Sequence, residues 1–146
     1  MTQSAQDALK AAVLYSDNER YALIKLPASA ITAAAGIIAE IGEPFAALLI
    51  DKDEVSLVMS AGDLEDYGKR LPGHETTGRY YRLITFDGEL SPDLIGFMAL
   101  IAKTLADAGV WILPLGAYTR DHLLVPEENY DTAIAALEQL KKSIKR

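Results

Sequence analysis

The most constraining feature of this sequence is a repeated order of predicted elements. In the first half, a strand at residues 21–26 is followed by a helix that ends at Gly42 and by two short strands. In the second half, a strand at residues 80–86 is followed by a helix that ends at Gly109 and by two further strands. A helical segment then closes each half, so each half predicts a βαββα unit. Two such units limit the fold more than any single motif does.

Both main helices carry boundary signals. Ser29 can cap the first helix, because Ser accepts hydrogen bonds from free backbone N–H groups. Ser91 followed by Pro92 predicts the start of the second helix, which we expect to run to residue 108. Gly96 would then lie inside that helix, at a cost of about 1 kcal/mol relative to Ala. Its presence there indicates close packing or the approach of a ligand.

Residues 109–125 hold the densest run of polar, potentially functional side chains. An almost wholly apolar strand leads into a polar loop at residues 116–121, and a second short strand follows. Pro114 cannot donate to a sheet, so the first strand should be bulged or end there. We expect Trp111 of this strand, like Phe97 of the preceding helix, to lie in the core.

The N-terminal segment allows two interpretations. A β-hairpin with strands at residues 9–15 and 20–26 is favoured, and a helix over residues 5–13 competes because Ala and Leu favour helices. Residues 71–79, LPGHETTGR, have the composition of a linker. The expected division is a first module at residues 1–70 that includes the hairpin, a linker at residues 71–79, and a second module at residues 80–146.

The βαββα order is most of a split βαβ, ferredoxin-like module, and each unit lacks one strand. The strand at residues 80–86, or a swapped strand, could complete the first unit. The N-terminal strand at residues 9–15 could complete the second.

Composition excludes several classes of function. A net charge of −7 argues against nucleic acid and anionic membrane surfaces as partners. The chain has no Cys, which excludes disulfides and thiolate chemistry. The first residues lack the pattern of a signal peptide, and no apolar run reaches the roughly 20 residues that span a bilayer. We expect a soluble, cytoplasmic protein.

Two stretches resemble a known family. RYYRLITFDGELSPDLIGFMALIAKTLADAGV and AYTRDHLLVPEENYDTAIAAL are similar to the C-terminal half of tandem ACT-domain proteins. Small bacterial ACT proteins and the arginine sensors of animals are among these. The resemblance implies an α+β fold of two ferredoxin-like (ACT-type, βαββαβ) modules, with antiparallel sheets and helices packed on one face. It also implies a non-catalytic regulatory protein that binds a small molecule, most often an amino acid, and forms homodimers.

The resemblance also implies where a ligand would bind. In ACT domains the site usually lies where the loop after the first strand and the start of the helix face a neighbouring module. The free N–H groups at a helix start suit a carboxylate, and Asp87, Glu89 or Asp121 could accept an ammonium group. Arg120 brings positive charge and argues against arginine as the ligand. The expected ligand-binding residues are Asp87, Gly88, Glu89, Leu90, Ser91, Gly96, Gly116, Ala117, Tyr118, Thr119, Arg120 and Asp121.

Other functions have weaker support in the sequence. Asp121 and His122 could form a catalytic pair, but neighbouring residues of a strand point to opposite faces, so we expect no catalytic residue. Two His and no Cys, without ligand spacing, predict no metal site, and we expect no cofactor. The alternative to a ligand-binding regulator is a structural or protein-interaction module that dimerises or docks on a partner without a ligand. An enzyme would need titratable side chains that converge only in the fold.

Overall fold

The computed structural model describes residues 3–144. The chain divides into two compact units. Glu19–Tyr81 form the central unit, and Met1–Asn18 together with Arg82–Arg146 form the terminal unit. Each unit carries its own hydrophobic core, so each is described by itself.

The central unit is a complete ferredoxin-like module. Its elements are β2 (Tyr21–Pro27), a 3₁₀ turn (Ala28–Ala30), α2 (Ile31–Ile41), β3 (Ala47–Ile50), β4 (Glu54–Ser60), α3 (Ala61–Tyr67), a second 3₁₀ turn (Gly68–Arg70) and β5 (Glu75–Thr76). β4 pairs antiparallel with both β3 and β2, and β5 pairs antiparallel with β2. The alternating residues Ala22, Ile24 and Leu26 of β2 enter the core under α2. Gly42 ends α2 in the left-handed conformation, with φ +66°.

The terminal unit has the same architecture with its fourth strand taken from the start of the chain. Its elements are α1 (Ala5–Ala11), β1 (Val13–Tyr15), β6 (Tyr81–Asp87), α4 (Phe97–Asp107), β7 (Leu113–Gly116), β8 (Asp121–Pro126), a 3₁₀ turn (Glu127–Asn129) and α5 (Tyr130–Ser143). The strand order is β1-β6-β8-β7, with β1 antiparallel to β6 and β7 antiparallel to β8. Two loops connect strands and helices at one end of this unit, the β6–α4 loop (88–96) and the β7–β8 loop (117–120).

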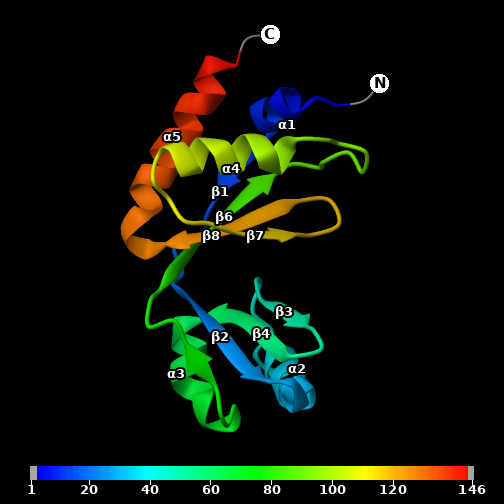
Figure 1. The fold of residues 1–146 in the computed structure, drawn as a ribbon, viewed down its shortest axis with the longest axis vertical. Helices are drawn as coiled ribbons and strands as arrows, with labels where there is room; N and C mark the ends of the chain where they lie inside the picture. Colours follow the sequence, from blue (N-terminus) through cyan, green and yellow to red (C-terminus); the bar gives the residue numbers. More distant parts are fainter. Residues whose placement is uncertain (1–2, 145–146) are drawn as a thin grey trace. The chain divides into compact units, whose positions relative to one another are not determined.

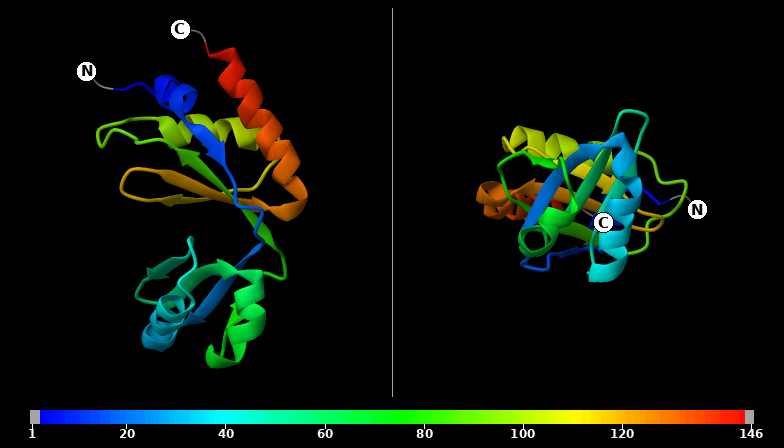
Figure 2. Two further views of the ribbon diagram at one scale, coloured as in Figure 1. Left: turned by 180° about the vertical axis from the view of Figure 1, so that it is seen from behind. Right: turned by 90° about the horizontal axis from the view of Figure 1, so that it is seen from below.

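Helices α1, α4 and α5 cover one face of this sheet, as Figures 1 and 2 show. The core between helices and sheet contains Leu9 of α1, Ile101 of α4, Leu137 of α5 and the alternating strand residues Ile84 and Phe86. The fold class expected from the sequence, two ferredoxin-like modules with antiparallel sheets, is confirmed.

The expected N-terminal hairpin is wrong, and the competing helix is right. Ser4 accepts a hydrogen bond from the Asp7 N–H and caps α1, and Leu9 of this helix is fully buried. Val13–Tyr15 then pair with β6. The first eighteen residues thus group with the terminal unit rather than with residues 19–70, and β5 lies within the expected linker at residues 71–79. As part of α1, Leu9 enters the same core as Ile84 and Phe86, and its burial favours the helix.

The second main helix begins later than Ser91 predicts. The Ser91 hydroxyl donates to the Asp93 carboxylate instead of capping a helix, and its N–H donates to Gln3 Oε1 at 3.1 Å. α4 starts at Phe97, after Gly96 in the left-handed conformation at φ +84°. Gly96 is therefore a helix boundary, and the expectation that it lies inside a helix is wrong. Only Gly adopts this conformation without strain.

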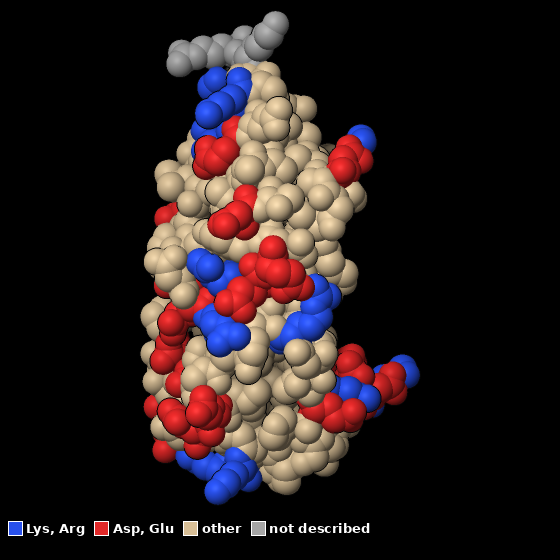
Figure 3. Space-filling view, turned by 90° about the vertical axis from the view of Figure 1, so that its left-hand side faces the viewer, with Lys and Arg blue, Asp and Glu red and all other residues tan. Residues whose placement is uncertain are grey.

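Phe97 is 3% exposed, as expected of a core residue, but Trp111 is 46% exposed. The expectation of a buried Trp111 is wrong, because it precedes β7 and is not held in the sheet. No helix among the described residues is long and apolar enough to span a membrane. On the face drawn in Figure 3, acidic and basic side chains are intermixed.

Candidate functional site

The β6–α4 and β7–β8 loops lie side by side in the terminal unit. The Leu90 N–H donates to the Thr119 carbonyl oxygen at 2.8 Å. Arg120 Nε donates to Asp87 Oδ1, also at 2.8 Å. The two loops expected from the sequence to form one site are therefore joined by a backbone hydrogen bond and an ion pair.

A cavity of about 390 Å³ lies between these loops and the start of α4. This volume is within the range typical of small-molecule sites. The lining residues are Leu90, Ser91, Pro92, Leu94, Gly96, Phe97, Met98, Ala99, Ala117, Tyr118, Thr119, Arg120 and Asp121.

Eight of the twelve expected ligand-binding residues line this cavity, and four do not. Asp87 lies at the end of β6 and reaches the site through its ion pair with Arg120. Gly88 faces the N-terminal segment, since a Cβ there would lie 3.6 Å from Ala12 Cα. Glu89 is exposed, and Gly116 pairs with Asp121 across the β7–β8 ladder.

Sequence reasoning missed five lining residues: Pro92, Leu94, Phe97, Met98 and Ala99. A helix that started at Ser91 would place Leu94 and Met98 on one face with Ile101 and Leu105, which predicts that they face the core. Because α4 starts at Phe97 instead, residues 91–96 form a loop, and Leu94 and Met98 line the cavity. The signal that could have found them is Gly96 itself, which is unfavourable within a helix.

The start of α4 offers hydrogen-bond donors to the cavity. Leu100 is the first residue of the helix whose N–H bonds to a backbone carbonyl of the same helix turn, that of Gly96 at 3.0 Å. The N–H groups of Phe97, Met98 and Ala99 have no intrahelical acceptor, and Gly96 has no side chain to cap them. These groups carry the positive end of the helix dipole, which favours an anionic group.

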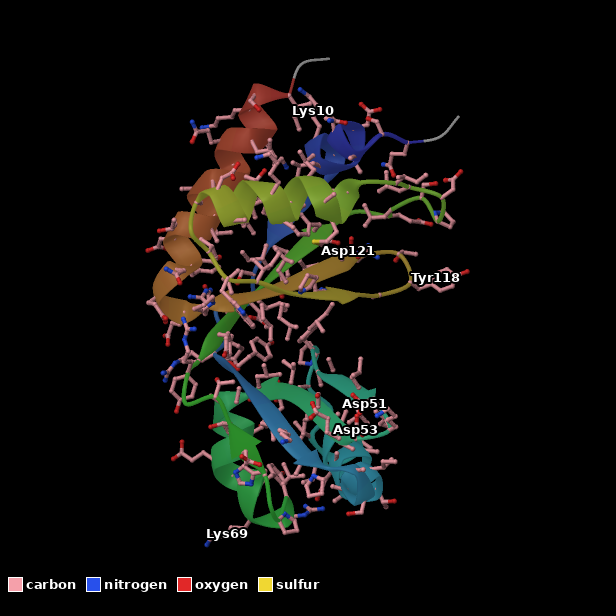
Figure 4. All side chains as sticks on the ribbon, viewed as in Figure 1. Lys10, Asp51, Asp53, Lys69, Tyr118 and Asp121 are labelled. Atoms are coloured by element: carbon pink, nitrogen blue, oxygen red, sulfur yellow. The ribbon has the colours of Figure 1, made fainter. Side chains whose placement is uncertain are left out.

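Asp121 supplies a carboxylate to the same cavity. Partial burial raises its pKa above the ordinary value, and the charge of His122 opposes that rise. Figure 4 places Asp121 where β8 begins and Tyr118 at the tip of the preceding loop. The side chain of Tyr118 is 98% exposed. Burial disfavours an isolated carboxylate, so a cationic group at Asp121 would relieve that cost.

Arg120 is held by two partners. Its Nε donates to Asp87, and its Nη1 donates to Thr119 Oγ1 at 3.0 Å. Both charged side chains are a little under half exposed, so the ion pair adds little to stability. The ion pair does place the negative charge of Asp87 next to the positive charge of Arg120 at the edge of the cavity.

His122 has a different environment from its neighbour. Its Nδ1 lies 2.8 Å from the hydroxyl of Thr85, which is buried on β6. Burial lowers the pKa of His122, while Asp121 raises it and Arg120 lowers it further. Among residues 3–144, no group of three or more His, Cys, Asp or Glu side chains is placed to hold a metal ion.

The geometry of the terminal unit is that of a ferredoxin-like domain with a cavity beside the start of α4. Residues 77–139, which contain that helix and both loops, match the family model of the ACT domain. This part of the chain is similar to ACT domains.

Two kinds of relative are similar to the chain. It is 28% identical over 102 residues to a rat (Rattus norvegicus) protein named cytosolic arginine sensor for mTORC1 subunit 1, a match that covers 69% of this chain and 31% of that protein. The chain therefore spans about a third of that relative.

Solved structures share the fold. A Vibrio cholerae protein described as a possible transport protein has a TM-score of 0.71 at 19% identity, over 93% of this chain and 94% of that one. Clostridium acetobutylicum aspartate kinase also gives 0.71, at 14% identity, over 90% of this chain and 34% of that one. The regulatory subunit of Thermus thermophilus aspartate kinase, in its ligand-free form, gives 0.62 at 16% identity, over 89% of this chain and 98% of that subunit.

Proposed function

We propose that the terminal unit is a non-catalytic regulatory ACT domain that binds a free amino acid in the cavity between the β6–α4 and β7–β8 loops. The observation that carries this proposal is the cavity of about 390 Å³, whose lining combines a helix N-terminus with a carboxylate. The similarity to an arginine sensor and to a regulatory subunit of an amino-acid kinase supports a regulatory role.

The chemistry of an amino acid matches this lining. Its carboxylate binds the N–H groups at the start of α4, where the helix dipole is positive. Its ammonium group binds Asp121, in a charge-assisted hydrogen bond. A ligand held by both loops would strengthen their contact, and this change in the loops is what a partner protein would sense.

We further propose a homodimer in the cytoplasm as the working form, with no nucleic acid or membrane partner. The net charge of −7 supports the latter point, since phosphate groups attract basic surfaces. The cytosolic arginine sensor among the relatives supports the proposed location.

The alternative function, a protein-interaction module without a ligand, has one observation in its favour. Ile95 is 86% exposed and Tyr118 is 98% exposed, and the two belong to the neighbouring loops. Exposed large apolar side chains of this kind occur at protein interfaces. In this reading the loops bind a partner directly.

A thermal-shift screen of the purified protein against the twenty amino acids and several nucleotides separates the two functions. A ligand at a hundred times its dissociation constant adds about 2.7 kcal/mol to stability. That corresponds to a rise of several degrees in the melting temperature.

We expect a selective rise with at least one amino acid that disappears in Asp121→Asn. The matched control is Asp131→Asn in the first turn of α5, which removes an acidic charge away from the cavity and should keep the rise. A folded protein that no amino acid stabilises would overturn the proposed function and favour the interaction module.

A further inference from the structure

The charged groups at the cavity are unequally available to a ligand. Asp121 lines the cavity, and Arg120 lines it with its guanidinium already bound to Asp87 and Thr119. If the ammonium group of an amino acid binds Asp121, the described lining of the cavity offers no second carboxylate to a cationic side chain. The positive charge of Arg120 is in turn opposed by Asp87, so an anionic side chain meets no free cation.

The remaining lining carries no further charged side chain. It combines the apolar residues Leu90, Pro92, Leu94, Phe97, Met98, Ala99 and Ala117 with the uncharged polar residues Ser91, Tyr118 and Thr119. A charged side chain placed against these residues would lose water without gaining a partner, which is unfavourable. An aliphatic or aromatic side chain would instead gain from leaving water.

We propose that the Arg120–Asp87 ion pair sets the charge selectivity of the cavity, which accepts amino acids with uncharged side chains and rejects basic and acidic ones. This inference rests on the proposed function and specifies its ligand class. It also separates the chain from its arginine-sensing relative, since arginine is among the rejected ligands.

Breaking the ion pair from either side should change the ligand class in opposite directions. Asp87→Asn keeps an acceptor for Arg120 Nε but leaves the guanidinium charge unopposed, so acidic side chains should gain a partner. Arg120→Gln removes the cation from the cavity lining and frees the Asp87 carboxylate at the end of β6, so basic side chains should no longer be repelled. Both side chains are partly exposed, so neither change should prevent folding.

The experiment measures calorimetric affinities of the wild type and both variants for leucine, methionine, phenylalanine, aspartate, glutamate, lysine and arginine. In the wild type we expect the best uncharged ligand to bind at least about tenfold more tightly than any charged one. Asp87→Asn should raise the affinity for glutamate or aspartate, and Arg120→Gln the affinity for arginine or lysine, each by about tenfold.

A second ion pair in the same unit provides the matched control. Lys103 Nζ and Asp107 Oδ2 lie 2.8 Å apart on α4, outside the cavity lining. Asp107→Asn breaks this pair and should leave the wild-type preference unchanged.

Two failures can be told apart. A wild type that binds arginine or glutamate as tightly as leucine, or two variants that keep the wild-type preference, would overturn the selectivity inference while the proposed function stands. A wild type and variants that bind none of the seven, and a wild type that none of the twenty amino acids stabilises, would overturn both.

Discussion

At the scale of single residues, Asp121 and Asp51 respond to folding in opposite ways. Burial raises the pKa of Asp121, whereas hydrogen bonds from the backbone N–H groups of Asp53 and Glu54 lower the pKa of Asp51. Asp51 lies in the exposed turn between β3 and β4, and Asp121 lies at the cavity (Figure 4). The charged form of Asp51 is stabilised, as expected of a turn residue. The charged form of Asp121 is destabilised, as is common for a carboxylate in a binding site.

This contrast predicts a pH-dependent effect of substitution. Since the folded pKa of Asp121 is raised, the folded state binds more protons than the unfolded state between the ordinary value of 3.8 and the folded value. Stability therefore falls as the pH rises through that window. Asp121→Asn removes this cost. Urea unfolding without ligand should show the variant more stable than the wild type at pH 7, with the difference shrinking toward pH 3.5.

Asp51→Asn is the control of opposite sign. The folded pKa of Asp51 is lowered, so its contribution to stability is present above the ordinary value of 3.8 and is lost as the pH falls through the folded value. The variant should be less stable than the wild type at pH 7. An Asp121→Asn variant that is also less stable at pH 7 would contradict the assigned burial cost.

At the scale of elements, the two units differ most where their first helix begins. In the central unit, β2 leads directly through a 3₁₀ turn at Ala28–Ala30 into α2. In the terminal unit, the β6–α4 loop separates strand and helix and forms one wall of the cavity. The two units share the fold, so the cavity of the terminal unit depends on this longer loop rather than on the fold itself.

Gly96 is the last residue of that loop, directly before α4, and substituting it tests the position of the helix start. Gly96→Ala places a side chain at φ +84°, which should cost about 1–2 kcal/mol although no atom lies within 4 Å of the new Cβ. Gly36→Ala in α2 also meets no atom within 4 Å, at an ordinary helical φ, and should stabilise by up to about 1 kcal/mol. Urea unfolding of both variants measures the difference.

A stabilising Gly96→Ala would show that Gly96 lies within a regular helix, as the sequence first indicates. The opposite signs of two identical substitutions therefore distinguish a helix that starts at Ser91 from one that starts at Phe97.

At the scale of the whole molecule, what the sequence predicts well is local. The tandem order of elements follows from hydrophobic periodicity and turn residues, and the structure agrees with it. The pairing of Val13 with Asp87 joins residues far apart in the chain, so periodicity could not choose between a hairpin and this partner. The start of α4 was misplaced because the Ser91 hydroxyl binds Asp93, a competition that cap preferences do not include.

Only part of the candidate site could be predicted from the sequence. The two loops came from a family resemblance, and the structure joins them through Leu90 and Thr119. The apolar wall formed by Leu94 and Met98 could not be read from the sequence, because it depends on where the helix begins. Ligand binding at these residues stays a prediction.

The division of the chain makes the last prediction, which concerns autonomous folding. Glu19–Tyr81 contain all four strands of the central unit, including β5, so this fragment should fold cooperatively alone. Residues 82–146 lack β1 and α1, which leaves the edge of β6 unpaired and the contacts of Leu9 with the core unfilled. Because a small domain has little stability to spare, that fragment should not fold.

Joining residues 1–18 to the end of residues 82–146 through a Gly-Ser linker should restore folding. Lys10 Nζ donates to the Ile144 carbonyl oxygen at 3.0 Å, so the end of α1 lies beside the end of α5. The linker must then reach back past the seven residues of α1, about 10 Å of helix, to join residue 1. Circular dichroism and urea unfolding of the three fragments provide the measurement. A cooperative transition in residues 82–146 alone would show that the first strand and helix are dispensable, and the terminal unit would then be a three-stranded module to which the N-terminal segment is only appended.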